Sequence, residues 1–174
     1  MMILRVNKAG NKKNVKIVFN SSPLIFLSRL DFLELFLQYD YQFYVPEVVI
    51  KEINAKQDEA SKYVNNVVAN NGLTIEQINL LSLAESINER LGRGEANAIA
   101  LATQLQSDYV ILDDFAARRE AMRLGLNVKG TLGIIRKMMA DDKVKIDDLD
   151  QFYQRLLQIK FRVKRSIFQA IFQD

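Results

Sequence analysis

Apolar residues along the chain follow two kinds of spacing. Alternating or continuous apolar runs predict strands, and apolar residues three and four positions apart predict helices, and the two kinds of segment alternate. Residues 15–19 alternate and then become fully apolar, which is typical of a strand that enters a buried core. Apolar runs of this kind predict strands at 15–19, 41–45, 108–112 and 126–128. Apolar residues three and four positions apart predict helices at 24–36, 46–53, 60–69, 78–91, 95–105, 116–124, 131–139, 147–157 and 163–172.

This alternation predicts an α/β fold, a three-layer α/β/α sandwich with a short, mainly parallel sheet. We predict that 55–90 is a helical insertion between sheet-forming units. Ser22 followed by Pro23 predicts a helix start, with the serine hydroxyl as N-cap and proline at the first helical position. No repeat or long linker divides the 174 residues, so we predict a single domain over 1–174.

The chain contains no cysteine and no histidine. Disulfides, iron–sulfur clusters and thiolate or imidazole metal sites are therefore excluded, and so is catalysis that uses a Ser-His-Asp triad. The remaining chemistry must use carboxylates, lysine, arginine, hydroxyls or a hard metal ion.

The net charge of +3 is unevenly distributed. The N-terminal segment 1–16 carries +5, the C-terminal tail 151–174 carries +4, and the body between them carries −6. We predict that the tail is helical and that both basic ends attract a polyanion such as RNA. The apolar side of the tail either belongs to the core or packs on another subunit.

The sequence predicts no membrane segment. The apolar-rich stretch 23–36 is interrupted by Ser28, Arg29, Asp31 and Glu34, and no signal-peptide pattern follows the basic N-terminus. We therefore expect a cytoplasmic protein.

Two of the predicted strands end in polar clusters. Asn20-Ser21-Ser22 follows the first, and Asp113-Asp114 follows the strand at 108–112. Ligands of open α/β sheets collect beyond the carboxyl ends of strands, so these clusters face one another if the two strands are neighbours.

Glu52 and Glu95, near the starts of two helices, can join these clusters. Converging carboxylates resist ionisation unless a cation offsets their repulsion, and oxygen ligands suit Mg²⁺ or Mn²⁺. Such ions commonly serve phosphodiester hydrolysis.

Each candidate also has a purely structural explanation. Asp113 or Asp114 can cap the following helix, Glu95 can complement a helix dipole, and Glu52 can be a solvated helix residue. Ser21 and Ser22 can both be caps. The functional interpretation depends on the convergence of these residues.

Four segments of the chain resemble PIN-domain proteins, in a branch near the VapC-type toxin ribonucleases. They are 17–25 (IVFNSSPLI), 94–102 (GEANAIALA), 109–118 (YVILDDFAAR) and 130–133 (GTLG), and the resemblance spans about 15–145. It implies a PIN fold, Mg²⁺- or Mn²⁺-dependent cleavage of RNA, frequent homodimers and often a small antitoxin protein as partner.

By position, the resemblance implies that Glu52, Glu95 and Asp113 or Asp114 are catalytic metal ligands, and that Ser22 is the hydroxyl residue near the first ligand, where it would bind substrate. Asn20 stands where most PIN nucleases have aspartate, so it offers a carbonyl oxygen but one negative charge fewer.

In the implied mechanism, Asp113, Glu95 and Asn20 hold one metal, while Asp114 and Glu52 place a second ion or orient the attacking water. Arg118 lies one turn beyond Asp114 and either contacts the RNA phosphate or neutralises the acidic cluster as a structural ion pair.

Three alternatives to an active ribonuclease follow. Asn20 favours a catalytically weakened PIN module that binds RNA or a protein partner without cleaving. A receiver-like phosphoacceptor domain would need an acidic pair after its first strand, where Asn20 stands. The Phe- and Ile-rich tail would suit a purely interacting partner of a toxin system. We recognise no aromatic stacking platform in the sequence, so it does not predict RNA specificity.

Overall fold

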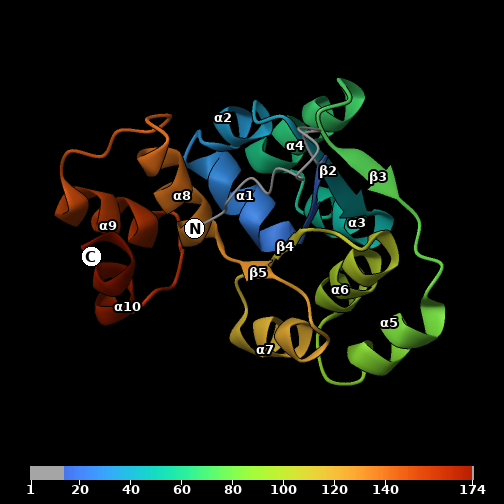
Figure 1. Ribbon diagram of the computed structural model, residues 1–174. Coiled ribbons are helices and arrows are strands. Elements are labelled where there is room, and N and C mark those ends of the chain that lie inside the picture. The colour runs from blue at the N-terminus through green and yellow to red at the C-terminus, as the bar shows by residue number, and fades with distance from the viewer. Residues whose placement is uncertain (1–13, 174) are drawn as a thin grey trace, which may run out of the picture.

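The computed structural model describes residues 14–173, which fold around a five-stranded sheet in the order β3-β2-β1-β4-β5 (Figure 1). All neighbouring strands are parallel. The strands are β1 (Val15–Phe19), β2 (Tyr41–Pro46), β3 (Thr74–Glu76), β4 (Tyr109–Ile111) and β5 (Val128–Lys129).

Helices connect the strands and cover the sheet. Those in the first half are α1 (Ser21–Arg29), α2 (Leu33–Leu37), α3 (Glu47–Asn54), α4 (Glu59–Ala69) and α5 (Leu81–Asn88). Those in the second half are α6 (Arg93–Leu105), α7 (Phe115–Arg123), α8 (Thr131–Ala140), α9 (Leu149–Gln158) and α10 (Arg165–Phe172).

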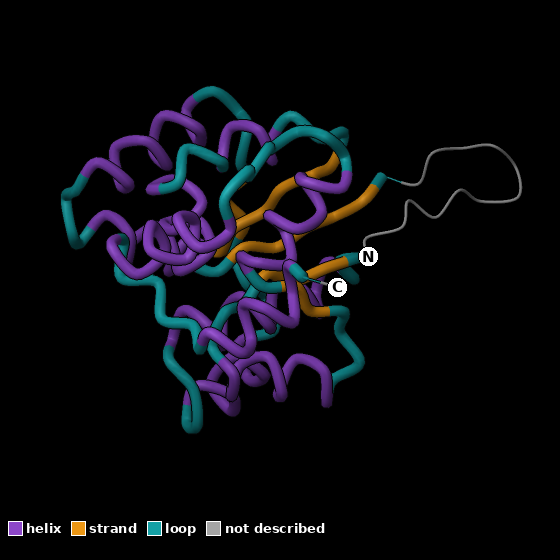
Figure 2. Tube along the Cα trace, turned by 90° about the vertical axis from the view of Figure 1, so that its left-hand side faces the viewer, coloured by secondary structure: helices purple, strands orange, loops and turns teal. Residues whose placement is uncertain are grey.

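The central strand β1 divides the core into two layers. Ile17 and Phe19 pack with residues of α1–α4 and α8–α10, whereas Val18 packs on the other face with residues of α5–α7. This split follows from the alternation of side chains along a strand. Figure 2 shows helices on both sides of the strands. The predicted three-layer α/β/α sandwich is confirmed, and its sheet is entirely parallel.

Four details of the predicted fold were wrong. The helix predicted over 24–36 is interrupted at residues 30–32 and forms α1 and α2. The segment 55–90 is more than a helical insertion because it contains β3, which pairs with β2 at the sheet edge. The helix predicted over 78–91 is limited to α5. The helix after β1 begins at Ser21, with Asn20 at the N-cap position but without a side-chain capping bond, so Ser22 is already inside the helix and Pro23 is its third residue.

The predicted helical character of the tail is confirmed by α9 and α10. Phe152, Leu156, Phe168 and Phe172 are buried in the core, and the ring centroids of Phe161 and Phe26 lie 4.8 Å apart. The main apolar side of the tail is therefore core and not a docking surface. Most of the basic N-terminal segment, residues 1–13, lies outside the described residues. Within 14–173, no helix is both long and apolar enough to cross a membrane.

Candidate functional site at the carboxyl edge of the sheet

The predicted polar clusters meet because β1 and β4 are neighbours. Their register pairs Phe19 with Ile111, so the chain leaves both strands at the same edge of the sheet. The Asn20 amide continues the ladder by donating to the Ile111 carbonyl at 3.3 Å. Residues 20–22 and 112–114 therefore lie side by side.

Two consecutive serines at the start of α1 contact two different carboxylates. The Ser22 hydroxyl donates to Oδ2 of Asp113 at 3.2 Å, and the Ser21 hydroxyl donates to Oε2 of Glu52 at 3.4 Å. Neither serine caps the helix. The first turn of α1 therefore links the carboxylate that follows β4 to the carboxylate on α3.

Asp113 is held by three donors from two helices. Besides Ser22, the Thr131 amide donates to its Oδ1 at 2.8 Å, and the Thr131 hydroxyl donates to its Oδ2 at 2.6 Å. Thr131 is fully buried and is the first residue of α8, whose N-cap is Gly130. Asp113 thus satisfies a free amide at the start of α8, and its carboxylate has a fixed orientation.

Glu52 lies against the start of α6. A Cβ at Gly94 would lie 2.4 Å from Oε2 of Glu52, so a side chain at this position would displace the Glu52 carboxylate. The pKa of Glu52 is raised, first by desolvation and then by the charge of Glu95, while hydrogen bonds from Ser21 and the Gly94 backbone oppose the rise. The two glutamates therefore form a like-charged pair.

Glu95 occupies the third position of α6, and its Oε2 lies over the N-cap Gly92, where a Cβ would be only 2.3 Å away. This position complements the helix dipole, as the structural explanation predicted, and it also places the charge of Glu95 beside Glu52. The structural explanation and the functional explanation for Glu95 are therefore compatible.

Asn20 is buried, with 2% of its surface exposed, and its Oδ1 has no hydrogen-bond partner. It is the N-cap residue of α1, yet its side chain forms no capping bond. Burial of an unpaired amide oxygen is costly, and native proteins rarely retain such a group without a use. Asn20 directly precedes the Ser21–Ser22 pair that contacts the carboxylates.

Asp114 and Arg118 have contacts of another kind. Oδ1 of Asp114 accepts the Ala117 amide at 2.8 Å, so this carboxylate caps α7 as its structural explanation predicted. The guanidinium of Arg118 donates to the Leu112 carbonyl at 3.0 Å. Its predicted contact with RNA phosphate stays a prediction, as do the metal-ligand and catalytic roles of all the candidates.

The structure brings Asn20, Ser22, Glu52, Glu95 and Asp113 to one edge of the sheet, while Asp114 caps the helix beside them. Within the described residues, no three acidic side chains form a group that could hold a metal ion. The carboxylates are arranged as the Glu52–Glu95 pair and the separately held Asp113, joined through two serines.

The sequence interpretation missed three residues of this edge. Ser21 was considered only as a cap, and Gly94 and Thr131 only as parts of motifs. A glycine at the second position of a helix, where no turn requires it, signals the close approach at Gly94. The role of Thr131 depends on a contact with a residue 18 positions away, which local patterns do not show.

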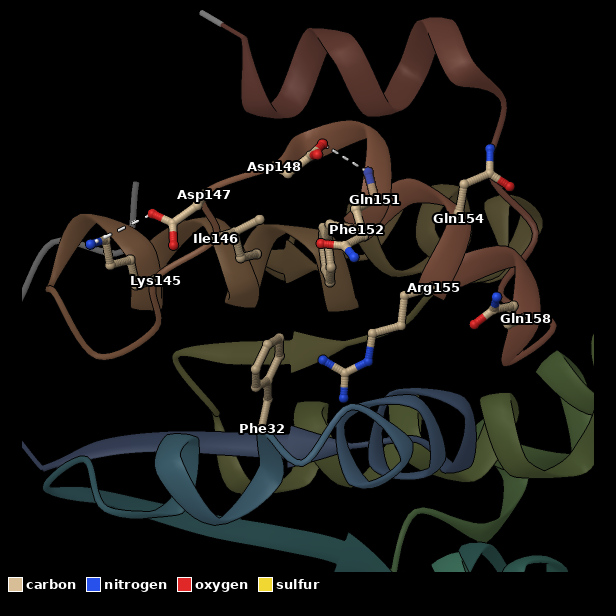
Figure 3. A pocket seen from close by; sticks show the side chains of 10 residues that line it. All are labelled: Phe32, Lys145, Ile146, Asp147, Asp148, Gln151, Phe152, Gln154, Arg155 and Gln158. Carbon is tan, nitrogen blue, oxygen red and sulfur yellow. Dashed lines mark hydrogen bonds and ion pairs between the residues drawn. The ribbon is translucent and has the colours of Figure 1, made fainter.

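Two hollows in the described part of the chain are lined by none of these carboxylates. One, of about 510 Å³, lies between Phe32 and α9 and is lined by none of the predicted site residues (Figure 3). There, Asp148 caps α9 through the Gln151 amide, and Asp147 pairs with Lys145. Another, of about 460 Å³, lies between α7 and the residues preceding α6.

Comparison with known protein families identifies the family to which this chain belongs. A family model described as "DUF3368: PIN domain" matches residues 16–174. The chain belongs to the PIN-domain family. The predicted family resemblance is thus confirmed, over a longer part of the chain than the motifs covered.

Among solved structures, the PIN-domain chain is similar to a PilT N-terminus domain protein, SSO1118, from the hyperthermophilic archaeon Sulfolobus solfataricus P2. The TM-score is 0.51 at 13% sequence identity, covering 77% of this chain and 98% of that one. This likeness supports the fold. No curated protein matches the sequence.

Proposed function

We propose that this PIN-domain protein is a ribonuclease that hydrolyses RNA phosphodiester bonds with Mg²⁺ or Mn²⁺ at the carboxyl edge of its sheet. Membership of a family of nucleases supports the reaction class. The observation that carries the proposal for this chain is the buried, unpartnered Oδ1 of Asn20 at the edge where Glu52, Glu95 and Asp113 gather.

The donor set fits a hard divalent cation. Every available ligand is an oxygen, because the chain has neither cysteine nor histidine. Glu52 and Glu95 repel one another, and a cation would relieve this repulsion. Asn20, Glu52, Glu95 and Asp113 would hold the ion, which when bound would activate water and offset phosphate charge.

The chain's own residues orient the site. Ser22 and Thr131 fix the Asp113 carboxylate, while Ser21 and the Gly94 backbone fix Glu52. Asp114 holds the start of α7 in place beside Asp113, and Arg118 secures the end of β4. These contacts limit the rotamers of the proposed ligands before a substrate arrives, which reduces the cost of ordering them later.

A second candidate is a weakened PIN module that binds RNA or a protein without cleaving. Two observations favour it: asparagine replaces a charged ligand at position 20, and the Asp114 carboxylate is engaged as a cap. A toxin role with an antitoxin partner, a homodimer, a cytoplasmic location and a single domain over 1–174 remain predictions.

The test is cleavage of single-stranded and structured RNA by the full chain with Mg²⁺, Mn²⁺ or EDTA. We expect cleavage with either ion and none with EDTA. Glu95→Gln should abolish it, whereas Glu85→Gln, on an exposed part of α5, should not. Metal-independent cleavage, or equal activity of both variants, would refute the proposal. RNA binding without cleavage would support the second candidate.

A further inference from the structure

Phe115 is the most exposed large apolar side chain in the described part of the protein, with 73% of its surface accessible. It is the first residue of α7 and directly follows Asp113-Asp114. Two residues of chain span at most about 7 Å, so the backbone of this ring lies beside the proposed site. A solvent-exposed phenyl ring gives up the stabilisation that burial of its apolar surface would provide.

Arg119 lies one turn further along α7, on the same face as Phe115. Its guanidinium carbon is 5.8 Å from the centroid of the Phe115 ring. No ion pair between Arg119 and a carboxylate occurs among residues 14–173. The pair therefore presents an aromatic face and a cation together, the combination that binds nucleobases and their phosphates.

Further cations lie on the same side of α7. Arg90, Arg119 and Arg123 line the hollow of about 460 Å³, together with Leu91, Ala116 and Glu120. Glu120 is its only acid and contacts both Arg90 and Arg123, at 2.9 and 2.6 Å. Three cations against one carboxylate leave a charge of +2, which complements a polyanion.

This arrangement differs from that of the basic C-terminal tail. The tail packs along α1 toward its far end, where Arg155 donates to the Leu30 carbonyl and Arg29 to the Ile159 carbonyl. A helix of nine residues is about 13 Å long, which exceeds the screening length of about 8 Å at physiological salt. Arg119, one turn into α7, therefore lies closer along its helix to Asp113 than the tail contacts at the end of α1 do.

We propose that Phe115 is a stacking platform for an unpaired base of RNA, and that Arg90, Arg119 and Arg123 bind the phosphates beside it. The inference rests on the proposed function for its ligand and specifies single-stranded RNA as the substrate. A base inside a duplex already stacks on both of its faces, so only an unpaired base offers a free face to the ring. Phe115 thereby positions the strand next to Asp113.

The test measures binding of the full chain, in EDTA, to a single-stranded RNA that contains 2-aminopurine, whose fluorescence is quenched by stacking. We expect quenching by the wild type and by Phe115→Trp. Phe115→Ala should lose the quenching and bind about 5- to 150-fold more weakly, the range measured for one base stacked on an aromatic ring. Met122→Ala, which removes another exposed side chain of α7, is the matched control.

Salt dependence tests the arginines separately. Arg119→Gln should lower the slope of log affinity against log salt by about 0.7, as expected for one lost phosphate contact on a single strand. Duplex RNA of the same sequence should bind Phe115→Ala and wild type equally.

Each outcome separates this inference from the ribonuclease proposal. If Phe115→Ala binds like the wild type, or loses affinity for duplex as much as for single strand, the stacking platform is refuted and the ribonuclease proposal stands. If binding depends on Phe115 but Mn²⁺ elicits no cleavage, the platform stands and the ribonuclease proposal fails. If the wild type binds no RNA, the platform is refuted, and Phe115 is better explained as a protein contact.

Discussion

The hydroxyl of Ser22 donates to Oδ2 of Asp113 across 91 positions of sequence and joins the first turn of α1 to the end of β4. We expect Ser22→Ala to lower the free energy of unfolding by about 1 kcal/mol, because Asp113 loses one of three donors. Urea denaturation measures this, with Ser82→Ala on exposed α5 as the control. Equal midpoints for the two variants would show that the contact contributes nothing.

Gly94 leaves room for the Glu52 carboxylate, and a pair of alanine variants tests whether this room matters for activity. A Cβ at Gly94 would displace the Glu52 carboxylate, whereas a Cβ at Gly133 meets nothing within 4 Å. Both positions are helical, so Gly133→Ala should stabilise the protein by about 0.5–1 kcal/mol. We expect Gly94→Ala to remain folded but to lose most RNA cleavage, and Gly133→Ala to keep it. Full activity of Gly94→Ala would mean that the position of Glu52 is unimportant.

The variant Asn20→Asp distinguishes the effect of residue 20 on the stability of the fold from its effect on metal binding. A buried carboxylate without a partner costs several kcal/mol, so this variant should melt at a lower temperature in EDTA than the wild type. The added charge should also strengthen binding of a cation, so Mn²⁺ should raise the melting temperature of the variant more than that of the wild type.

Thermal melts with and without Mn²⁺ measure both effects. Asn88→Asp, at an exposed position, controls for charge alone. A Mn²⁺ shift no larger than that of the wild type would argue against a metal ion beside residue 20.

The contacts of Asp141 predict how the free energy of unfolding depends on pH. Its pKa is lowered by hydrogen bonds from Lys137 and Tyr39, at 2.8 and 2.6 Å. A carboxylate with a lowered folded-state pKa stabilises the fold above its unfolded pKa and loses this effect as pH falls through the folded value.

Asp141→Asn should therefore destabilise the protein by about 1 kcal/mol at pH 7, allowing for solvent screening, and much less at pH 3. Urea midpoints across this range measure the change. Asp147→Asn, in an exposed pair with Lys145, is the control. A pH-independent difference would contradict the assignment.

The sequence predicted those parts of the fold that are encoded locally. β1 and β4 consist of apolar runs, and Asp113 and Asn20 stand directly after them, so the edge where they meet was predictable once the strands were taken as neighbours. β3 was missed because Thr74 and Ile75 are exposed at the sheet edge and carry no buried pattern. Its pairing with β2 is a tertiary property.

The same distinction applies to the site. Glu52, Glu95, Asp113 and Ser22 were predictable from motifs, but the partners that orient them come from elsewhere in the chain, as Thr131 does. Phe115 was missed because a single phenylalanine at a helix start is indistinguishable, in sequence, from a core residue. Only its exposure and the position of Arg119 indicate another use.

The most direct test of the central claim is the initial rate of RNA cleavage in Mn²⁺ by wild type, Asp113→Asn and Asp148→Asn. Asp148 is an aspartate that caps α9, far from the carboxylate edge in sequence, and serves as the matched control. We predict that Asp113→Asn, although folded, is slower by about 100-fold or more, since a lost ligand removes several kcal/mol of charge stabilisation. Asp148→Asn should cleave like the wild type. Equal rates for wild type and Asp113→Asn would contradict the claim that this edge of the sheet cleaves RNA.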